Sequence, residues 1–423
     1  MTITLPPALR NRDFRLFWTG ATLSAIGSQF TTVAMAWQIY ELTNSPLQIG
    51  LLGLGRALPQ IGLALVGGYL ADAVDRRRLM MSIQLGQVVI SVALALLTAL
   101  DVVTPGILLA AAVLLALGSA IEAPPRQAIV PNLVPRDILG SAIALNTTQR
   151  SLGMIVGPAL AGVLLAASGP ALCYSIDAAS WLAMLAALAV IKVRPGERAV
   201  VRFSLTAVMG GVQFVLTQPV ILAFMVLDFG ATLFGSPHAL LPIFARDILE
   251  VGPLGLGVMY AAPSVGGVVA GLVMSVMPQI REAGKWVLLG VAFYAICTIG
   301  FAFSGTLWIA VIALIGTGVG NLVSAVLRGT TNQLLTPDQL RGRVAAVNSA
   351  FVMGGPQLGQ FESGVIASLW SAQVSAATGG LGALLLVGAL SLLPGVWRFR
   401  LERPASSDAP PAVTSAGGRD PRS

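Results

Sequence analysis

Three of the charged residues that lie inside long apolar stretches of this sequence are candidates for function. Arg56 lies about nine residues into its stretch, which is roughly 14 Å along a helix and near the middle of a membrane. Asp228 and Glu362 lie about eight and seven residues from the nearer end of theirs. A charge at the centre of a spanning helix costs about 2.5–3.5 kcal/mol, so we expect these three to serve function. The alternative for each is structural, either an internal ion pair or a carboxyl that is protonated and hydrogen-bonded. Buried carboxyls can exchange protons, which makes Asp228 and Glu362 candidates for proton coupling and Arg56 a candidate for substrate binding or coupling.

Amide and aromatic side chains also interrupt the apolar stretches. Gln29 and Trp37 belong to the first stretch, and Asn321 belongs to the tenth. A lining of amides and aromatic rings suits a large amphipathic molecule, so we predict that all three face a binding cavity. Such residues equally often pack or form hydrogen bonds between helices, and the sequence does not decide between the two.

Twelve apolar runs would have to position these residues. Of the 423 residues, 56% are hydrophobic and 10% are charged, whereas soluble proteins carry about 25% charge. The runs lack alternation and are too long for barrel strands of about ten residues, so we predict an all-α integral membrane protein with twelve transmembrane helices. The runs are Leu16–Tyr40, Leu47–Ala71, Leu79–Leu100, Val102–Ala123, Ser141–Ala167, Ala171–Ile191, Val220–Ala245, Leu254–Met277, Trp286–Phe303, Leu307–Val326, Val344–Leu369 and Gly379–Val396.

The composition argues against several other classes. One histidine and two cysteines are too few for a metal centre or a disulfide framework, so we expect no metal and no cofactor. The basic residues do not cluster as a nucleic-acid surface would require, so we expect no nucleic-acid partner. An integral-membrane enzyme is the alternative from another class, and no convergent catalytic cluster supports it. We expect a monomer in the cell membrane, whose partners are the lipid bilayer and a small-molecule substrate.

Basic residues occur in alternate interruptions between the runs, whereas the other interruptions are mostly acidic. By the positive-inside rule, both termini are predicted to be cytosolic. The basic segments hold Arg10, Arg12, Arg15, Arg76–Arg78, Arg126, Arg136, Lys192, Arg194, Arg198, Arg202, Arg281, Lys285, Arg328, Arg341, Arg343, Arg398, Arg400 and Arg403. The acidic ones hold Glu41, Asp101, Asp247 and Glu250, with Arg246 as their single basic residue.

The sequence repeats itself at an offset of 202 residues. Gly50, Gly53 and Gly55 align with Gly252, Gly255 and Gly257, and the same shift aligns Arg126 with Arg328 and Gly153, Gly157 and Gly162 with Gly355, Gly359 and Gly364. Six spans per repeat give both copies the same orientation, an arrangement found in transporters whose site lies between the halves. We predict six-helix bundles at 1–191 and 219–403, a cytosolic linker at 192–218 and a disordered tail at 404–423.

Two motifs give the sequence a family resemblance. Residues 68–78 are similar to the pattern G-x-x-x-D-R-x-G-R-R of the major facilitator superfamily, with departures at Ala73 and Asp75. Residues 153–162 are similar to the pattern G-x-x-x-G-P-x-x-G-G associated with antiporters. The chain therefore resembles this superfamily, and most closely its bacterial subfamily of enterobactin exporters and drug efflux proteins.

The resemblance implies a gate that alternately closes the two sides of the membrane. It places Asp72 against the start of the eleventh span near Arg341–Val344, and it pairs Arg76 with Glu122, so that both contacts would latch the cytosolic side. The small residues Gly153, Gly157, Pro158 and Gly162 would seal one half against the other by close helix packing. We predict a conformational role for all of these residues.

The resemblance also implies function. The family's first, fourth, seventh and tenth spans line the cavity, which would place Asp228 in the cavity, Arg56 and Glu362 at its border, and Asp177 and Arg150 in less central positions. We expect a secondary transporter that exports a drug or siderophore in exchange for protons, with the proton gradient as its energy source. Uptake is the alternative, because the fold alone does not fix direction.

Overall fold

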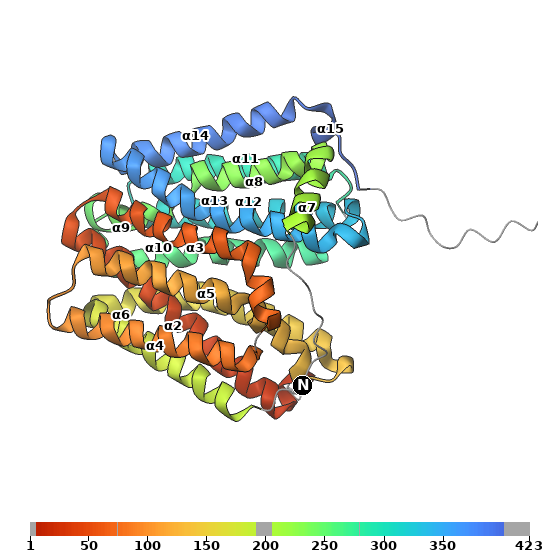
Figure 1. Ribbon diagram of the computed structural model, residues 1–423. Helices are drawn as coiled ribbons and strands as arrows, with labels where there is room; N and C mark the ends of the chain where they lie inside the picture. The colour runs from red at the N-terminus through yellow and green to blue at the C-terminus, as the bar shows by residue number, and fades with distance from the viewer. Residues whose placement is uncertain (1–5, 74, 192–204, 279, 402–423) are drawn as a thin grey trace, which may run out of the picture.

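The computed structural model describes residues 6–73, 75–191, 205–278 and 280–401, and helices make up all of their regular structure (Figure 1). The helices are α1 Pro7–Arg10, α2 Arg12–Thr43, α3 Pro46–Ala73, α4 Arg76–Ala99, α5 Pro105–Leu133, η1 Arg136–Ile138, α6 Leu139–Val190, α7 Leu205–Thr217, α8 Pro219–Gly235, η2 Pro237–Ala239, α9 Leu241–Ile243, η3 Phe244–Ile248, α10 Gly252–Val276, α11 Ala283–Ala302, α12 Leu307–Leu335, η4 Asp338–Leu340, α13 Arg341–Leu369, α14 Ala372–Ser391 and α15 Pro394–Trp397.

Eight helical segments in the described part of the chain are long and apolar enough to cross a membrane. One of them runs for 55 residues from Arg136 to Val190, and it bends back on itself at Gly169, whose φ of 73° is left-handed. Pro170 follows at once, a position suited to the first turn of a new helix. The predicted runs Ser141–Ala167 and Ala171–Ile191 are therefore the two arms of α6.

Helices α2, α3 and α13 fall outside the set of eight, although each has 28 residues or more. In α2, the side chains of Ser28, Gln29, Thr31 and Thr32 lower the hydropathy and line a cavity. Polar side chains of this kind are typical of helices that face a site rather than lipid.

Two predicted boundaries are wrong in the same way. The fourth run was predicted to end at Ala123 and the tenth at Val326, but α5 continues to Leu133 and α12 to Leu335. Arg126 and Arg328, predicted in the interruptions after these runs, therefore lie inside helices.

The repeat is visible in how these two helices begin. Thr104 and Thr306 are 202 residues apart, and each accepts a hydrogen bond on its side chain from the backbone N–H three residues later, at 3.3 Å in α5 and 3.5 Å in α12. Such a cap satisfies one of the N–H groups that a helix start leaves unpaired. The two copies of the sequence thus start equivalent helices with the same device.

Helix packing divides into two groups and a boundary between them. Helices α2 to α6 pack against one another, and α8 and α10 to α14 form a second group (Figure 1). The groups meet mainly where α3 packs on α13 and α6 packs on α10. We call the group of α2 to α6 the N-half and the group of α8 and α10 to α14 the C-half; the bounds 1–191 and 219–403 of the two bundles stay predictions.

The predicted linker and tail are only partly described. Residues 192–204 and 404–423 lie outside the described part of the chain. Within the predicted linker 192–218, residues 205–217 form α7, which packs against α8 and α13.

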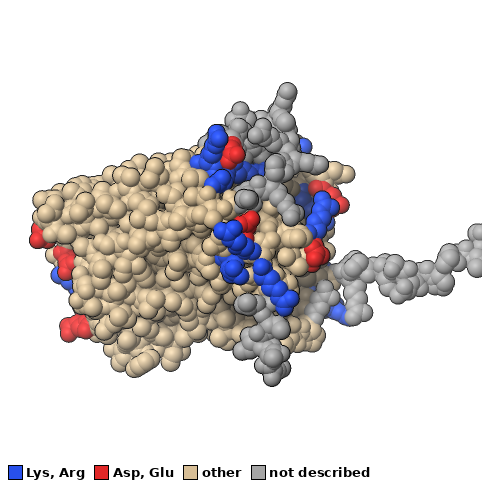
Figure 2. Space-filling model, turned by 90° about the horizontal axis from the view of Figure 1, so that it is seen from below, with Lys and Arg blue, Asp and Glu red and all other residues tan. Residues whose placement is uncertain are grey.

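Charge is distributed unevenly along the helix axes. Figure 2 shows most Lys and Arg side chains gathered toward one end of the molecule, with some acidic side chains among them, and mainly acidic side chains at the opposite end. We call the end with Glu41, Asp101, Asp247 and Glu250 the acidic end, and the end with the starts of α2, α4 and α13 the basic end.

Candidate transport site

The two halves touch most closely at the acidic end, through glycines. A Cβ added at Gly162 of α6 would lie 2.7 Å from the carbonyl oxygen of Pro253 and 2.9 Å from the Cα of Gly257 in α10. On the other side, a Cβ at Gly364 of α13 would lie 2.7 Å from the Cα of Gly50 in α3. Both contacts bring two backbones together, which only residues without a side chain permit.

These paired contacts revise the alignment of the repeat in one region. Gly162 and Gly364 are equivalent at the predicted offset of 202, but their partners Gly257 and Gly50 are 207 residues apart. The glycines of α3 and α10 are therefore related by a slightly longer shift than the 202 predicted from Gly50, Gly53 and Gly55. The connection before α10, which contains η3, accommodates the additional residues.

A polar cluster joins the halves beside these glycines. The hydroxyl of Tyr40, at the end of α2, donates a hydrogen bond to Asp247 in η3. The guanidinium of Arg246 lies 5.6 Å from the centre of the Tyr40 ring, and it is 3.8 Å from Asp247. The cluster fixes the acidic end of the N-half to the loop before α10.

Apolar packing shows the same asymmetry. One large core at the acidic end contains residues of both halves, among them Met35 and Ile39 of α2 and Phe244 and Met259 of the C-half. The remaining three cores each belong to a single half, and they lie toward the basic end. The halves are thus held together at the acidic end and packed separately toward the basic end.

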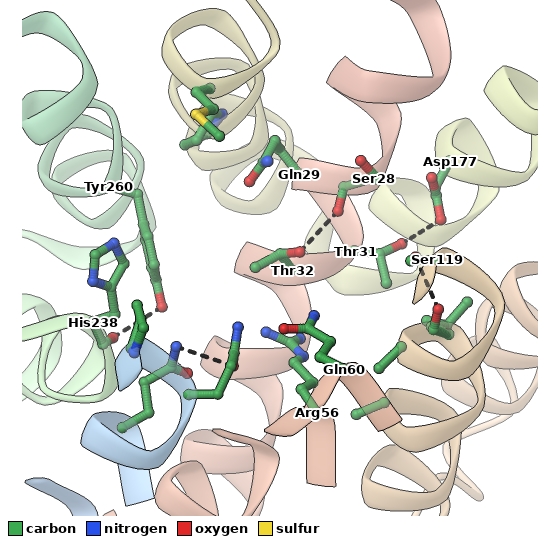
Figure 3. A pocket seen from close by; sticks show the side chains of 18 of the residues that line it. Ser28, Gln29, Thr31, Thr32, Arg56, Gln60, Ser119, Asp177, His238 and Tyr260 are labelled. Carbon is green, nitrogen blue, oxygen red and sulfur yellow. Dashed lines mark hydrogen bonds between the residues drawn. The ribbon is translucent and has the colours of Figure 1, made fainter. Parts of the chain in front are cut away.

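A cavity of about 440 Å³ lies between the halves (Figure 3). Polar side chains dominate its lining, which draws on all six apolar runs of the N-half and on η2, α10 and α13. The polar, charged and aromatic lining residues are Ser28, Gln29, Thr31, Thr32, Arg56, Gln60, Gln87, Ser119, Asp177, Trp181, His238, Tyr260, Ser264, Gln357 and Gln360. Its volume is within the range of about 300–1,000 Å³ typical of small-molecule sites.

Arg56 is the arginine in this lining. Its predicted position is near the middle of the membrane and at the border of the cavity. Its guanidinium contacts the sulfur of Met35 at 3.9 Å, and no described acidic side chain forms an ion pair with it. Gln60 lies one turn further along α3 and faces the same space (Figure 3). A guanidinium that has no carboxylate partner retains its donors for a carboxylate, phenolate or carbonyl of a bound molecule.

A second cavity of about 550 Å³ adjoins the first on the C-half side. The two share Met154, His238, Ser264 and Pro356. Its remaining lining is more apolar, with Val268, Leu272, Leu322 and Ala325 beside Asn321 and Tyr294. The predicted residues Gln29 and Asn321 thus lie in adjoining cavities, one polar and one largely apolar.

Asp228 does not lie in either cavity, contrary to its predicted cavity-facing position. Its carboxylate forms an ion pair with Arg328 of α12, which also donates a hydrogen bond of 2.7 Å to the hydroxyl of Ser324. Asp228 and Arg328 are both buried inside the C-half. The sequence did not indicate this pair, because Arg328 was assigned to an interruption rather than to a helix.

The acid that lines the central cavity is Asp177, which the family template placed in a peripheral span. Its carboxylate accepts hydrogen bonds from Thr31 at 2.7 Å and Ser91 at 2.8 Å. Each of the three lies inside a separate apolar run. Polar residues inside three separate runs could form hydrogen bonds with one another between helices, and this pattern could have identified Asp177 from the sequence.

Glu362 and Trp37 lie outside both cavities. The hydroxyl of Ser363 donates to Glu362 at 3.4 Å, and Trp37 packs against the core of the acidic end. Their predicted roles in coupling and binding stay predictions. The exposed Arg150 also lies outside the lining of both cavities.

The predicted latch of the cytosolic side is only partly visible. The side chain of Asp72 lies outside the described residues, so its contact near Arg341–Val344 stays a prediction. Glu122 is buried and accepts a hydrogen bond of 3.0 Å from Gln84, and it lies 3.8 Å from Arg126. The predicted contact of Arg76 with Glu122 also stays a prediction.

The glycine-proline motif of α6 divides into two surfaces. A Cβ added at Gly153 would lie 3.0 Å from the Cβ of Ala25, and one at Gly157 would lie 2.7 Å from the Cβ of Gln29, so both pack on α2 within the N-half. Pro158 lines the central cavity, and both Pro158 and Gly162 meet α10 of the C-half: a Cβ added at Gly257 would lie 2.5 Å from the carbonyl oxygen of Pro158 and 2.8 Å from the Cα of Gly162. The repeat-related Gly355 and Gly359 likewise pack on Thr232 of α8.

The family model of transmembrane secretion effectors matches residues 3–414 of the chain. The chain belongs to this family of the major facilitator superfamily. It is a multi-pass membrane transporter and not an enzyme, as the sequence predicted.

Curated relatives match the chain over nearly its whole length. The chain is 28% identical over 411 residues to the enterobactin exporter EntS of Escherichia coli O6:K15:H31, covering 96% of this chain and 95% of the relative. It is 27% identical over 410 residues to enterobactin exporter EntS of Shigella boydii serotype 18, covering 95% of both chains.

Solved structures share the fold of this family member. The nucleoside transporter NupG superposes with a TM-score of 0.72 at 12% identity, covering 90% of this chain and 98% of the other. A bacterial homologue of the iron transporter ferroportin in an inward-facing state gives a TM-score of 0.68 at 16% identity, covering 90% and 98%. These similarities confirm the predicted superfamily fold.

Replacing Gly162 by valine is expected to prevent closure of the acidic end. Any Cβ there meets the backbone of α10, and overpacking costs about 1–3 kcal/mol, which lowers the population of the closed state by roughly 5- to 150-fold. A cysteine introduced at the buried Leu240 (Leu240→Cys) should then react with a membrane-impermeant maleimide added at the acidic end. Gly86→Val is the matched control, because a Cβ at Gly86 has no neighbour within 4 Å. Equal labelling in both variants would contradict the expectation.

Proposed function

We propose that this protein exports a small amphipathic molecule from the cytosol by alternating access, in exchange for protons. The observation that carries the proposal is Arg56, a guanidinium without an acidic partner in a polar cavity between two halves that meet at one end. A substrate with an anionic or strongly electronegative head would bind Arg56, and its apolar part would occupy the adjoining cavity of the C-half. The names of the curated relatives favour a siderophore as that molecule.

We further propose twelve spanning helices in two six-helix bundles, with both termini in the cytosol. The positive-inside rule makes the basic end cytosolic, so the closed acidic end faces outward and the separately packed basic end faces the cytosol. The arrangement corresponds to an inward-facing state, which is the state that takes up a substrate for export. The protein would act as a monomer, because one chain supplies both halves of the cavity.

The proton gradient is the proposed energy source. One proton that crosses the membrane contributes about 2.3 kcal/mol per 100 mV, so one or two protons suffice for modest uphill export. The exchange requires a protonatable group in the substrate cavity that is accessible first from one side of the membrane and then from the other. Asp228 and Glu362 are the groups predicted from the sequence, and the cavity itself offers Asp177.

Transport of enterobactin into inverted membrane vesicles tests the proposal. We expect accumulation that depends on an imposed pH gradient and is abolished by a protonophore, with vesicles lacking the protein as the control. Accumulation in right-side-out vesicles or intact cells would instead favour uptake. If enterobactin does not accumulate in either orientation, a screen of deletion strains for drug sensitivity would identify another substrate.

A further inference from the structure

A second polar site lies in the central cavity that Arg56 also lines. Asp177 of α6 is 1% exposed, and Figure 3 shows it facing Thr31 of α2. Thr31 and Ser91 both donate to the same carboxylate oxygen, Oδ2. Helices α2, α4 and α6 are thus tied together at one oxygen of one carboxyl group.

The other oxygen of this carboxyl, Oδ1, forms no hydrogen bond of normal geometry with the described residues, and the indole of Trp181, one turn further along α6, also interacts with the carboxyl. Gly27 of α2 packs closely against this part of α6, because a Cβ at that position would lie 3.2 Å from Oδ1 and 2.1 Å from the hydroxyl of Ser180. A buried carboxylate oxygen without a partner is costly, so Oδ1 requires a ligand. A proton is a suitable ligand for Oδ1. The site is small and lies beside a cavity, and Oδ2 already accepts two hydrogen bonds.

Few ionisable groups face this site. Thr31 of α2 and Ser91 of α4 are neutral hydroxyls, and on α6 itself the nearest ionisable side chains are Cys173 and Tyr174. Tyr174 donates a hydrogen bond of 2.8 Å to Gln38. Across the cavity lie Arg56 of α3, His238 of η2 and Tyr260 of α10. No described cation forms an ion pair with Asp177, so a proton there would not have to displace one.

We propose that Oδ1 of Asp177 is the atom that binds and releases the transported proton. An O–H bond forms at Oδ1 when water from the acidic end supplies a proton, and it breaks when the cavity opens to the basic end and water accepts that proton. An ionised Oδ1 can instead accept a hydrogen bond from a donor on the substrate. Proton and substrate then compete for one oxygen, which is the requirement for exchange. The inference rests on the proposed function and assigns its coupling residue to Asp177.

Infrared difference spectroscopy of the purified full-length protein in lipid tests the site without any substrate. A protonated carboxyl gives a C=O stretching band that titrates with pH, and we expect Asp177→Asn to remove such a band. Ser91→Ala should shift its frequency, because the group loses a hydrogen bond. Glu362→Gln is the matched control and should retain the band. A band that is lost only in Glu362→Gln would overturn the assignment.

Vesicle transport separates the inference from the proposed function. With enterobactin as the probe, Asp177→Asn should lose pH-gradient-driven accumulation at least about tenfold and retain exchange of enterobactin across the membrane, since exchange moves no net proton. Gradient-driven accumulation by Asp177→Asn at the wild-type level would overturn the inference alone. Wild-type transport that ignores the pH gradient would overturn the proposed coupling, and the infrared band would still decide whether Asp177 exchanges a proton.

Discussion

Arg56→Gln is expected to lower the apparent affinity for the exported molecule by at least roughly 30-fold, because removal of one partner from a buried charged hydrogen bond costs about 2–5 kcal/mol. The side chain lines the central cavity and has no described carboxylate partner, so its donors remain for the substrate. Glutamine retains a polar group of smaller reach and removes the charge. The fold should be unaffected, because no ion pair is broken.

The variant Arg56→Lys separates the effect of the charge from the effect of the guanidinium geometry. Arg56→Lys retains the charge but loses the planar pair of donors that matches a carboxylate or similar group, so we expect an intermediate loss of affinity. Arg136→Gln, at an exposed arginine of the basic end, removes the same charge away from the cavity and should transport like the wild type. Concentration-dependent uptake of enterobactin into inverted vesicles measures all three. Wild-type affinity in Arg56→Gln would remove Arg56 from the binding site.

The sequence predicted the helices well because their cause is local. A run of apolar residues long enough to cross a membrane must form a helix, whatever surrounds it, since lipid offers no partner for the backbone. The errors lie at the ends that leave the apolar region and in the run Val220–Ala245, which the structure divides into α8, η2, α9 and part of η3. Polar residues near Arg126 and Arg328 suggested an interruption, but α5 and α12 continue through them.

The site was harder to predict because it depends on which helix faces which. Arg56 was identified from its depth alone, and depth is the property that apolar runs specify. Asp228 has a similar depth, yet Arg328 neutralises it within the C-half. Asp177 is the acid in the cavity, because α6 turns its acidic side chain toward hydroxyls of α2 and α4. Such pairings between distant helices have no signature in the hydropathy of one run.

The buried pair of Asp228 and Arg328 carries the second large expected effect. Breaking a buried ion pair by removal of one partner destabilises a protein by about 3–5 kcal/mol, because the other charge stays buried alone. Asp228→Asn should therefore lower the thermal midpoint of the purified protein sharply. Ser324 would remain a hydrogen-bond partner of Arg328 but does not neutralise it.

The repeat supplies a matched control for this pair. Arg126 is the equivalent of Arg328, but its acidic neighbour Glu122 lies 3.8 Å away on the same helix, and 22% of the Arg126 side chain is exposed. Water can screen that charge, and Gln84 can still bond an amide at position 122. Glu122→Gln should therefore destabilise the protein less than Asp228→Asn. An equal or larger loss in Glu122→Gln would contradict this account of the two pairs.

The double variant Asp228→Leu with Arg328→Met decides whether the pair is structural or takes part in coupling. Replacement of a buried ion pair by apolar side chains of similar size is often neutral or stabilising, so this variant should recover the thermal midpoint that Asp228→Asn loses. If the pair only holds α8 to α12, the recovered protein should also retain pH-gradient-driven transport. A folded double variant that has lost the gradient dependence would instead return Asp228 to the proton pathway, as the sequence alone predicted. Since Asp177 is intact in this variant, such a result would mean that a second carboxyl shares the coupling with it.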